Sequence, residues 1–160
     1  MSESTNINTG LVVLLHRCFR AVNKVRQKEL SEFGITASQS SIIRTIYRLG
    51  NEATASKISE QLFLELNSVS EQLTRMEKEG LIKRKKGSGR RPVTRLEVAE
   101  KGHELHLKTM KQESAERIMS VLTEEEKKEL WSFLIRIRDQ AARELNMESE
   151  EYYPPAEPPG

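Results

Sequence analysis

The sequence contains a single cysteine, Cys18, and it is poor in aromatic residues, which make up 5% of the chain. One cysteine excludes an intrachain disulfide framework and a structural zinc site built from cysteines. The longest apolar run, residues 11–15, is far too short to span a bilayer, and no signal-peptide pattern opens the chain. Hydrophobic residues make up 36% of the 160 residues, which is low for a self-contained globule. We therefore expect a soluble, cytoplasmic protein whose core a partner subunit completes.

Proline is almost absent from the body of the chain. Four of the five prolines lie in the last seven residues, and the fifth is Pro92. Because proline is the residue that interrupts helices most strongly, most of the chain up to Tyr153 is free to be helical. The spacing of apolar residues predicts helices over about 11–33, 36–49, 54–62, 67–79, 99–122 and from 124 onwards.

Three sites have the pattern of a capping box, in which a Ser or Thr and a Glu or Gln three residues later bond each other's backbone. These pairs are Thr36 with Gln39, Ser68 with Glu71, and Thr123 with Glu126. For the helix over 67–79, Glu65 or Asn67 is an alternative to Ser68 as the N-cap.

A charged, non-helical segment interrupts the helices. Residues 81–86 and 92–98 read as two strands around the tip Gly87-Ser88-Gly89, with Pro92 at a strand start. The net charge is only +2, but residues 83–95 hold seven Lys and Arg and no acid, which leaves 19 bases against 24 acids elsewhere. A basic segment on an otherwise acidic protein is typical of a contact with a polyanion.

Two short helices followed by a basic hairpin indicate a winged helix-turn-helix. In this device the second helix enters the DNA major groove and the hairpin, or wing, lies near the backbone or the minor groove. The side chains expected to contact DNA are Asn67, Ser68, Ser70, Gln72, Thr74 and Arg75 on the helix, and Lys86, Arg90 and Arg91 on the wing. The alternatives are an ordinary polar helix face with a solvated strand pair, or a winged helix that binds a protein as an adaptor.

The chain also resembles the MarR family of bacterial transcription regulators over residues 10–145. The matching segments are Gly34-Ile35-Thr36-Ala37-Ser38-Gln39, Ile58-Ser59-Glu60-Gln61-Leu62, residues 69–84, residues 96–102 and Leu122-Thr123-Glu124-Glu125-Glu126. The resemblance implies a homodimer on a pseudo-palindromic operator, released when a small, often aromatic ligand binds or a cysteine is oxidised. Such wings commonly carry an Asp two residues before an Arg, whereas residues 87–92 contain no acid.

A dimer is also expected from the residues alone, because both terminal helices carry apolar stripes that the small central lobe is unable to cover. An apolar stripe left in water forgoes about 25 cal/mol per Å², and a two-fold partner covers it. The predicted organisation is an N-terminal arm over 1–35, a DNA-binding lobe over 36–98, C-terminal helices over 99–146 that complete the dimer, and a flexible, acidic, proline-rich tail over 147–160.

Few residues suggest redox activity, metal binding or catalysis. Cys18 lies on the first apolar stripe, where burial raises a thiol pKa, so packing is the favoured role and redox sensing the alternative. His103 and His106 are three residues apart, but a metal would need a third ligand such as His16 or Glu104, and surface histidines are the favoured interpretation. We find no catalytic motif and expect neither an enzyme nor a cofactor.

The family resemblance places an effector pocket where the first, second and fifth helices meet. The expected lining residues are His16, Arg20, Ile43, Tyr47 and His106. A tyrosine ring and a guanidinium suit a planar aromatic acid or phenol. The alternative is that Tyr47 belongs to the core and Arg20 is solvated.

Overall fold

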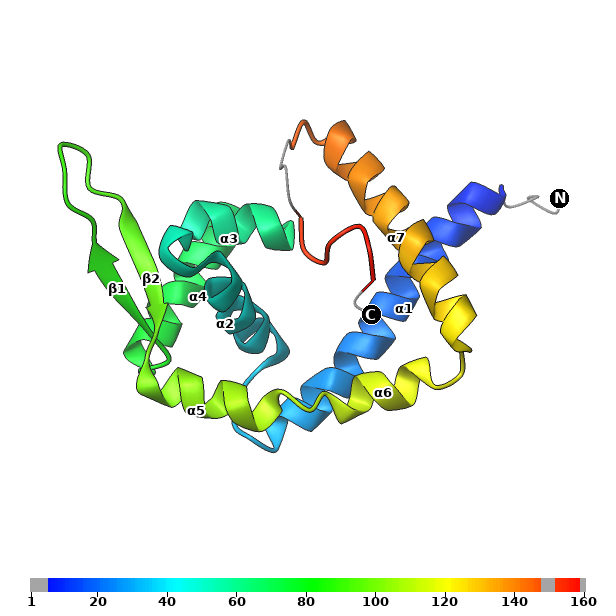
Figure 1. Cartoon of the computed structure of the whole chain (residues 1–160), viewed down its shortest axis with the longest axis horizontal. Coiled ribbons are helices and arrows are strands. Elements are labelled where there is room, and N and C mark those ends of the chain that lie inside the picture. The colour runs from blue at the N-terminus through cyan, green and yellow to red at the C-terminus, as the bar shows by residue number, and fades with distance from the viewer. Residues whose placement is uncertain (1–5, 148–151, 159–160) are drawn as a thin grey trace, which may run out of the picture.

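The computed structural model describes residues 6–147 and 152–158, and it is mainly helical with one antiparallel hairpin, as predicted. The elements in chain order are α1 (Ile7–Ser31), α2 (Ala37–Leu49), the short 3-10 helix η1 (Gly50–Glu52), α3 (Ala55–Leu62), α4 (Leu66–Lys78), β1 (Ile82–Lys86), β2 (Thr94–Val98), α5 (Glu100–Thr109), α6 (Glu113–Met119) and α7 (Glu124–Glu144). Figure 1 shows a lobe of α2, α3, α4 and the hairpin at one end and an arm of α1, α6 and α7 at the other.

The lobe has an apolar core to which each of its helices and strands contributes. Its most deeply buried apolar side chains include Ile42, Ile43, Ile58, Val69, Leu73, Met76 and Ile82. Leu30, from the last turn of α1, belongs to the same cluster. The lobe is therefore packed onto the end of the arm as well as linked to it by the chain.

Two of the three predicted capping boxes form. Thr36 and Gln39 bond each other's backbone at the start of α2, and Thr123 and Glu126 do so at the start of α7. The prediction of a Ser68–Glu71 box was wrong, because α4 begins at Leu66 and Ser68 lies inside its first turn. Glu65 occupies the N-cap position but makes no side-chain capping bond.

The hairpin pairs β1 with β2 from Ile82 opposite Val98 to Lys86 opposite Thr94. Its root is fixed to the lobe, since Ile82 and Leu96 are buried and the Leu96 N–H donates to the Ala53 carbonyl at 2.9 Å. The wing therefore extends from a rigid base.

The helix predicted over 99–122 is broken in two. Gln112 adopts a left-handed conformation (φ 48°) between α5 and α6. Across the break, the Glu29 carboxylate of α1 accepts hydrogen bonds from the Ser114 N–H at 3.2 Å and from the Ser114 hydroxyl. The same carboxylate pairs with Arg26 at 2.5 Å, and Arg26 donates to the Thr109 carbonyl. Glu29 of α1, which is far from α6 in the sequence, thus caps the start of α6. The start of α6 therefore depends on tertiary contacts.

Much of the apolar stripe of each terminal helix is left exposed by the described part of the chain. The exposed large hydrophobic residues include Leu11, Leu14, Val22 and Val25 of α1, Phe133, Leu134 and Ile137 of α7, and Leu145 at the C-cap of α7. Cys18, which was expected to be buried, is exposed as well. The error has one cause: the stripe exists, but no segment among the described residues covers it.

The tail was expected to be flexible, and its described part, residues 152–158, makes contacts with the rest of the chain. Figure 1 shows it running between the lobe and α7, and its backbone carbonyls accept hydrogen bonds from Trp131 and Arg138. The rest of the predicted tail beyond Met147 lies outside the described residues. Among the helices of the described ranges, none has the length and apolar character needed to cross a membrane.

Candidate nucleic-acid interface

The exposed face of α4 carries short polar side chains at its N-terminal end. Asn67 and Ser68 are exposed, and Ser70 is half-buried beside the buried Val69. Glu65 makes no capping bond, so among the described residues no N-cap side chain accepts from the N–H groups of this first turn. Such groups attract phosphate. This end of α4 can therefore approach a nucleic acid closely.

Gln72 is held in place by a residue that the sequence did not single out. The Ser38 hydroxyl of α2 donates to Gln72 Oε1 at 2.8 Å. With its oxygen engaged, the Gln72 amide presents its N–H groups, which suit acceptors such as guanine O6 and N7 or thymine O4 in the major groove. No local pattern pointed to Ser38, because it lies 34 positions from its partner.

Thr74 and Arg84 join α4 to the wing. Arg84 of β1 pairs with Glu77 at 2.5 Å and donates to Thr74 Oγ1 at 3.1 Å, while the Thr74 hydroxyl donates to the Ser70 carbonyl. The Thr74 hydroxyl thus helps to position Arg84, and its proton is used within α4 rather than offered to a base. Arg84 lay in the basic run noted in the sequence, but its contact with α4 needed the folded lobe.

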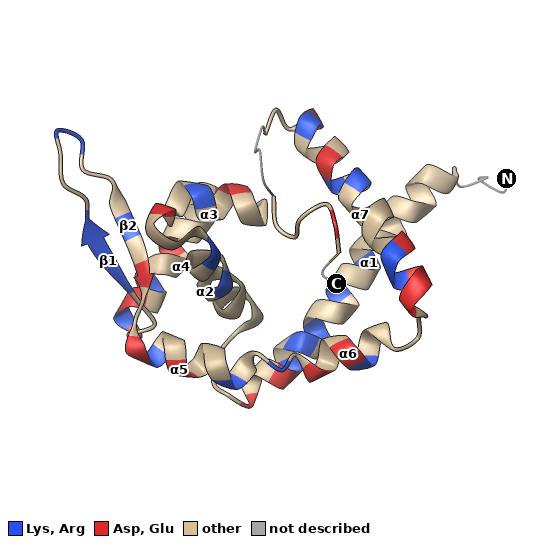
Figure 2. Ribbon diagram, in the orientation of Figure 1, with Lys and Arg blue, Asp and Glu red and all other residues tan. Residues whose placement is uncertain are grey.

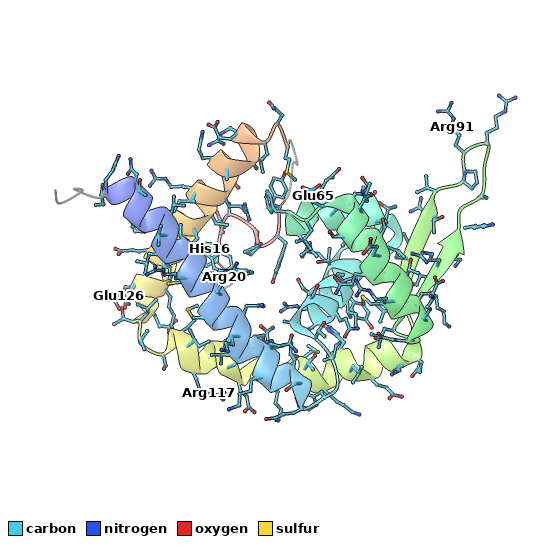
Figure 3. All side chains as sticks on the ribbon, turned by 180° about the vertical axis from the view of Figure 1, so that it is seen from behind. His16, Arg20, Glu65, Arg91, Arg117 and Glu126 are labelled. Carbon is cyan, nitrogen blue, oxygen red and sulfur yellow. The ribbon has the colours of Figure 1, made fainter. Side chains whose placement is uncertain are left out.

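The wing presents a cationic surface beyond this contact. Figure 2 shows Lys and Arg along β1 and at the tip of the hairpin. Lys86, Arg90, Arg91 and Arg75 of α4 are exposed, and Figure 3 shows Arg91 at the tip, pointing away from the body. Within the described ranges, neither Arg90 nor Arg91 has an acidic partner. These guanidiniums are therefore available to an external polyanion.

A second cluster lies where α2 meets α5. The Tyr47 hydroxyl is 2.5 Å from His103 Nδ1, and the Tyr47 ring stacks on His106 with centroids 4.7 Å apart. Burial lowers the pKa of His106, and the charges of Arg44 and His103 lower it further. Burial also raises the pKa of Tyr47, with a contribution from Glu100. The cluster thus combines two stacked aromatic rings with a nearby cation, Arg44.

Residues 35–91, which contain α2 to α4 and most of the wing, match the MarR family. The chain carries a MarR-family domain. Members of this family are transcriptional regulators and not enzymes, in agreement with the sequence-based expectation. The regulator MhqR of Bacillus subtilis (strain 168) is 26% identical over 124 residues, which is 76% of this chain and 85% of MhqR.

Solved structures of the same fold cover nearly the whole chain. The organohalide-sensing regulator RdhR-CbdbA1625, in its 2,4-dichlorophenol-bound form, superposes with a TM-score of 0.84 at 23% identity and covers 95% of this chain and 91% of its own. A mutant MarR from E. coli in complex with operator DNA superposes with a TM-score of 0.75 at 21% identity, covering 85% and 99%. These matches establish that the MarR domain and its flanking helices have the winged-helix fold of this family.

In this MarR-domain protein the five residues expected at an effector pocket form two separate pairs and one core residue. Tyr47 and His106 stack, as described, and Arg20 Nε lies 2.8 Å from His16 Nε2 on the exposed surface of α1 (Figure 3). Ile43 is fully buried in the lobe core, so it offers no surface to a ligand.

Cys18 lies between Leu14 and Val22 on one face of α1, at intervals of four residues. A partner that covers this face would also cover the thiol. As for metals, the described residues contain no group of three or more His, Cys, Asp or Glu side chains able to hold an ion.

Proposed function

We propose that the protein is a homodimeric, sequence-specific double-stranded DNA-binding repressor that leaves its operator when a small aromatic effector binds. The observation that supports this most directly is the joint surface of α4 and the wing. It combines open N–H groups and small polar side chains at one end with a cationic hairpin that Arg84 fixes against α4.

The proposed dimer is formed through the exposed apolar faces of α1 and α7. Phe19 is 67% exposed and Phe133 53% exposed in the single chain, which is unusual for rings of this size in a stable monomer. A two-fold partner would place two copies of α4 against successive major grooves, about 34–36 Å apart. The operator is therefore expected to be pseudo-palindromic.

The proposed effector site is the Tyr47–His106 pair with Arg44. A planar anionic ring could stack in this cluster and pair with the guanidinium. The structure of RdhR-CbdbA1625 with 2,4-dichlorophenol supports this chemical class. Ligand binding would release DNA only if the ligand favours a spacing of the lobes that misfits the two grooves.

The decisive experiment is fluorescence anisotropy with the promoter DNA of the protein's own operon and with random DNA of equal length. We expect tighter binding to the promoter and a log–log salt slope near −5 to −7, for about six to eight phosphate contacts by a dimer. The double variant Arg90→Ala/Arg91→Ala should weaken binding to both DNAs alike and make the slope shallower. The matched control is Lys108→Ala, an exposed cation on α5 away from this surface.

A slope near zero, or an unchanged Arg90→Ala/Arg91→Ala protein, would refute the wing assignment. No binding to either DNA would instead favour a protein-binding adaptor. Redox control through Cys18 is tested in the same assay with peroxide-treated protein: we expect no change, because a dimer partner would cover the thiol. Loss of binding that Cys18→Ser prevents would establish the redox alternative.

A further inference from the structure

A groove lies between the lobe and the arm, and the tail of the chain packs into it and forms part of its lining; about 1080 Å³ of the groove stays open beside the tail. The lobe side includes Arg48 of α2 and Gln61 of α3, and the arm side includes Arg138 and Ala142 of α7. Tyr152, Tyr153, Pro155 and Ala156 also line this groove. The tail therefore stands between two bodies whose relative position matters for any two-lobed DNA-binding dimer.

On the lobe side the tail is held through its two tyrosines. The Arg48 guanidinium lies 4.4 Å from the centre of the Tyr153 ring, and the Tyr153 N–H donates to Gln61 Oε1 at 3.3 Å. The Tyr152 ring packs on Phe63, with centroids 5.0 Å apart. Cation–π and aromatic contacts of this kind give specificity for aromatic side chains.

On the arm side the tail is held through its backbone. Arg138 donates to the Pro154 carbonyl at 2.6 Å and lies 5.6 Å from the Tyr152 ring. The Trp131 indole N–H is shared between the carbonyls of Pro155 at 3.1 Å and Ala156 at 3.2 Å. An indole donor to the carbonyls of a proline-rich segment is a known way to recognise extended peptides.

We propose that this groove is a peptide-binding site for a Tyr-Tyr-Pro-Pro segment, that its occupant is the chain's own tail, and that the bound tail fixes the spacing between lobe and arm. This role rests on the proposed function, because lobe spacing is what would match or mismatch the operator. Only residues 148–151 connect Met147 to Tyr152. A short tether gives an effective concentration on the order of millimolar, so even weak intrinsic contacts keep the site occupied.

The first test uses Trp131, which is the one tryptophan of the chain and a direct contact of the tail. In the full-length double variant Tyr152→Ala/Tyr153→Ala, we expect its fluorescence to shift to longer wavelength and to be quenched more easily by acrylamide. Adding the free peptide Tyr-Tyr-Pro-Pro-Ala at millimolar concentration should reverse both changes. Glu157→Ala, an exposed tail position, is the matched control and should leave the spectrum unchanged. Identical spectra of the wild-type protein and the double variant would overturn the docking.

The second test measures the spacing between lobes without DNA. A spin label on Glu71→Cys, an exposed position of α4, in a Cys18→Ser background reports the distance between the two copies of α4. We expect a narrow distance distribution with the native tail and a broader or shifted one with Tyr152→Ala/Tyr153→Ala. An unchanged distribution would refute the tail as a spacing device.

A failure of the proposed tail docking can be distinguished from a failure of the proposed function. Loss of all dipolar coupling would contradict the dimer of the proposed function, whereas the Trp131 readout tests tail docking in either case.

Discussion

The Glu29 carboxylate supports the junction between α1, α5 and α6, and replacing it by glutamine should weaken the whole arm. Desolvation raises the pKa of this carboxyl, but hydrogen bonds from the Ser114 side chain, from Arg26 and from the Ser114 backbone, together with the charge of Arg26, lower the pKa from 4.5 to about 2. The Glu29 and Arg26 side chains are only 17% and 14% exposed, so solvent screens their interaction weakly.

The magnitude follows from linkage between protonation and folding. One pKa unit corresponds to about 1.4 kcal/mol, so the ionised Glu29 contributes about 3 kcal/mol to the free energy of unfolding at pH 7. Because the folded-state pKa is below the unfolded-state value, this contribution is present above pH 4.5 and is lost as the pH falls towards 2. Glu29→Gln removes it and leaves Arg26 without its counterion. We expect a loss of about 2–3 kcal/mol at pH 7 and roughly half of that at pH 3.

The assay is urea unfolding followed by circular dichroism at pH 7 and pH 3, at one fixed protein concentration because dimerisation would contribute to stability. Glu32→Gln is the matched control: Glu32 is exposed at the C-cap of the same helix and should change stability by less than about 0.5 kcal/mol. A Glu29→Gln loss that is equal at both pH values, or no larger than that of Glu32→Gln, would refute the reasoning.

Three further outcomes are expected. Gly102→Ala should destabilise the lobe by about 1–3 kcal/mol, because an added Cβ would collide with the Leu81 carbonyl. Urea unfolding, with Glu104→Ala as the control, measures this loss, and an increase in stability would contradict the prediction. Gln72→Ala should lower promoter affinity by roughly 1–3 kcal/mol while changing random-DNA affinity little; equal losses on both DNAs would show that Gln72 only positions α4. Tyr47→Ala should abolish calorimetric binding of salicylate-like aromatic acids, and binding that survives the substitution would place the effector elsewhere.

The sequence predicted those features that depend on neighbours along the chain. The capping boxes at Thr36 and Thr123 bring together residues three apart, and both form. The break before α6 escaped prediction because the acceptor for the Ser114 N–H comes from Glu29, 85 positions away. Likewise, helical periodicity located the stripe that contains Cys18, but periodicity gives no information on whether the same chain covers a stripe.

The candidate site divides in the same way. Polar residues off the apolar stripe of α4 identified a surface, and their exposure in the structure agrees with that reading for Asn67 and Ser68. The hydrogen-bond partners of individual side chains could not be predicted from the sequence. Thr74 binds Arg84 and Gln72 binds Ser38 only once α2, α4 and β1 are packed together. The composition of the tail predicted that it would not be helical, but not that Arg48 and Arg138 would lie against its rings.

The bond from the Leu96 N–H to the Ala53 carbonyl has a consequence for how the wing folds. A two-stranded hairpin is marginally stable in water on its own, and here its root gains a third backbone partner from the segment between α2 and α3. The base of the wing should therefore unfold only together with the lobe, while its tip moves freely. In hydrogen exchange the Leu96 amide should follow global unfolding, whereas the Gly89 amide should exchange within seconds. If the hairpin were grafted onto another protein without α2 and α3, it would keep its charged residues but would not hold its paired conformation.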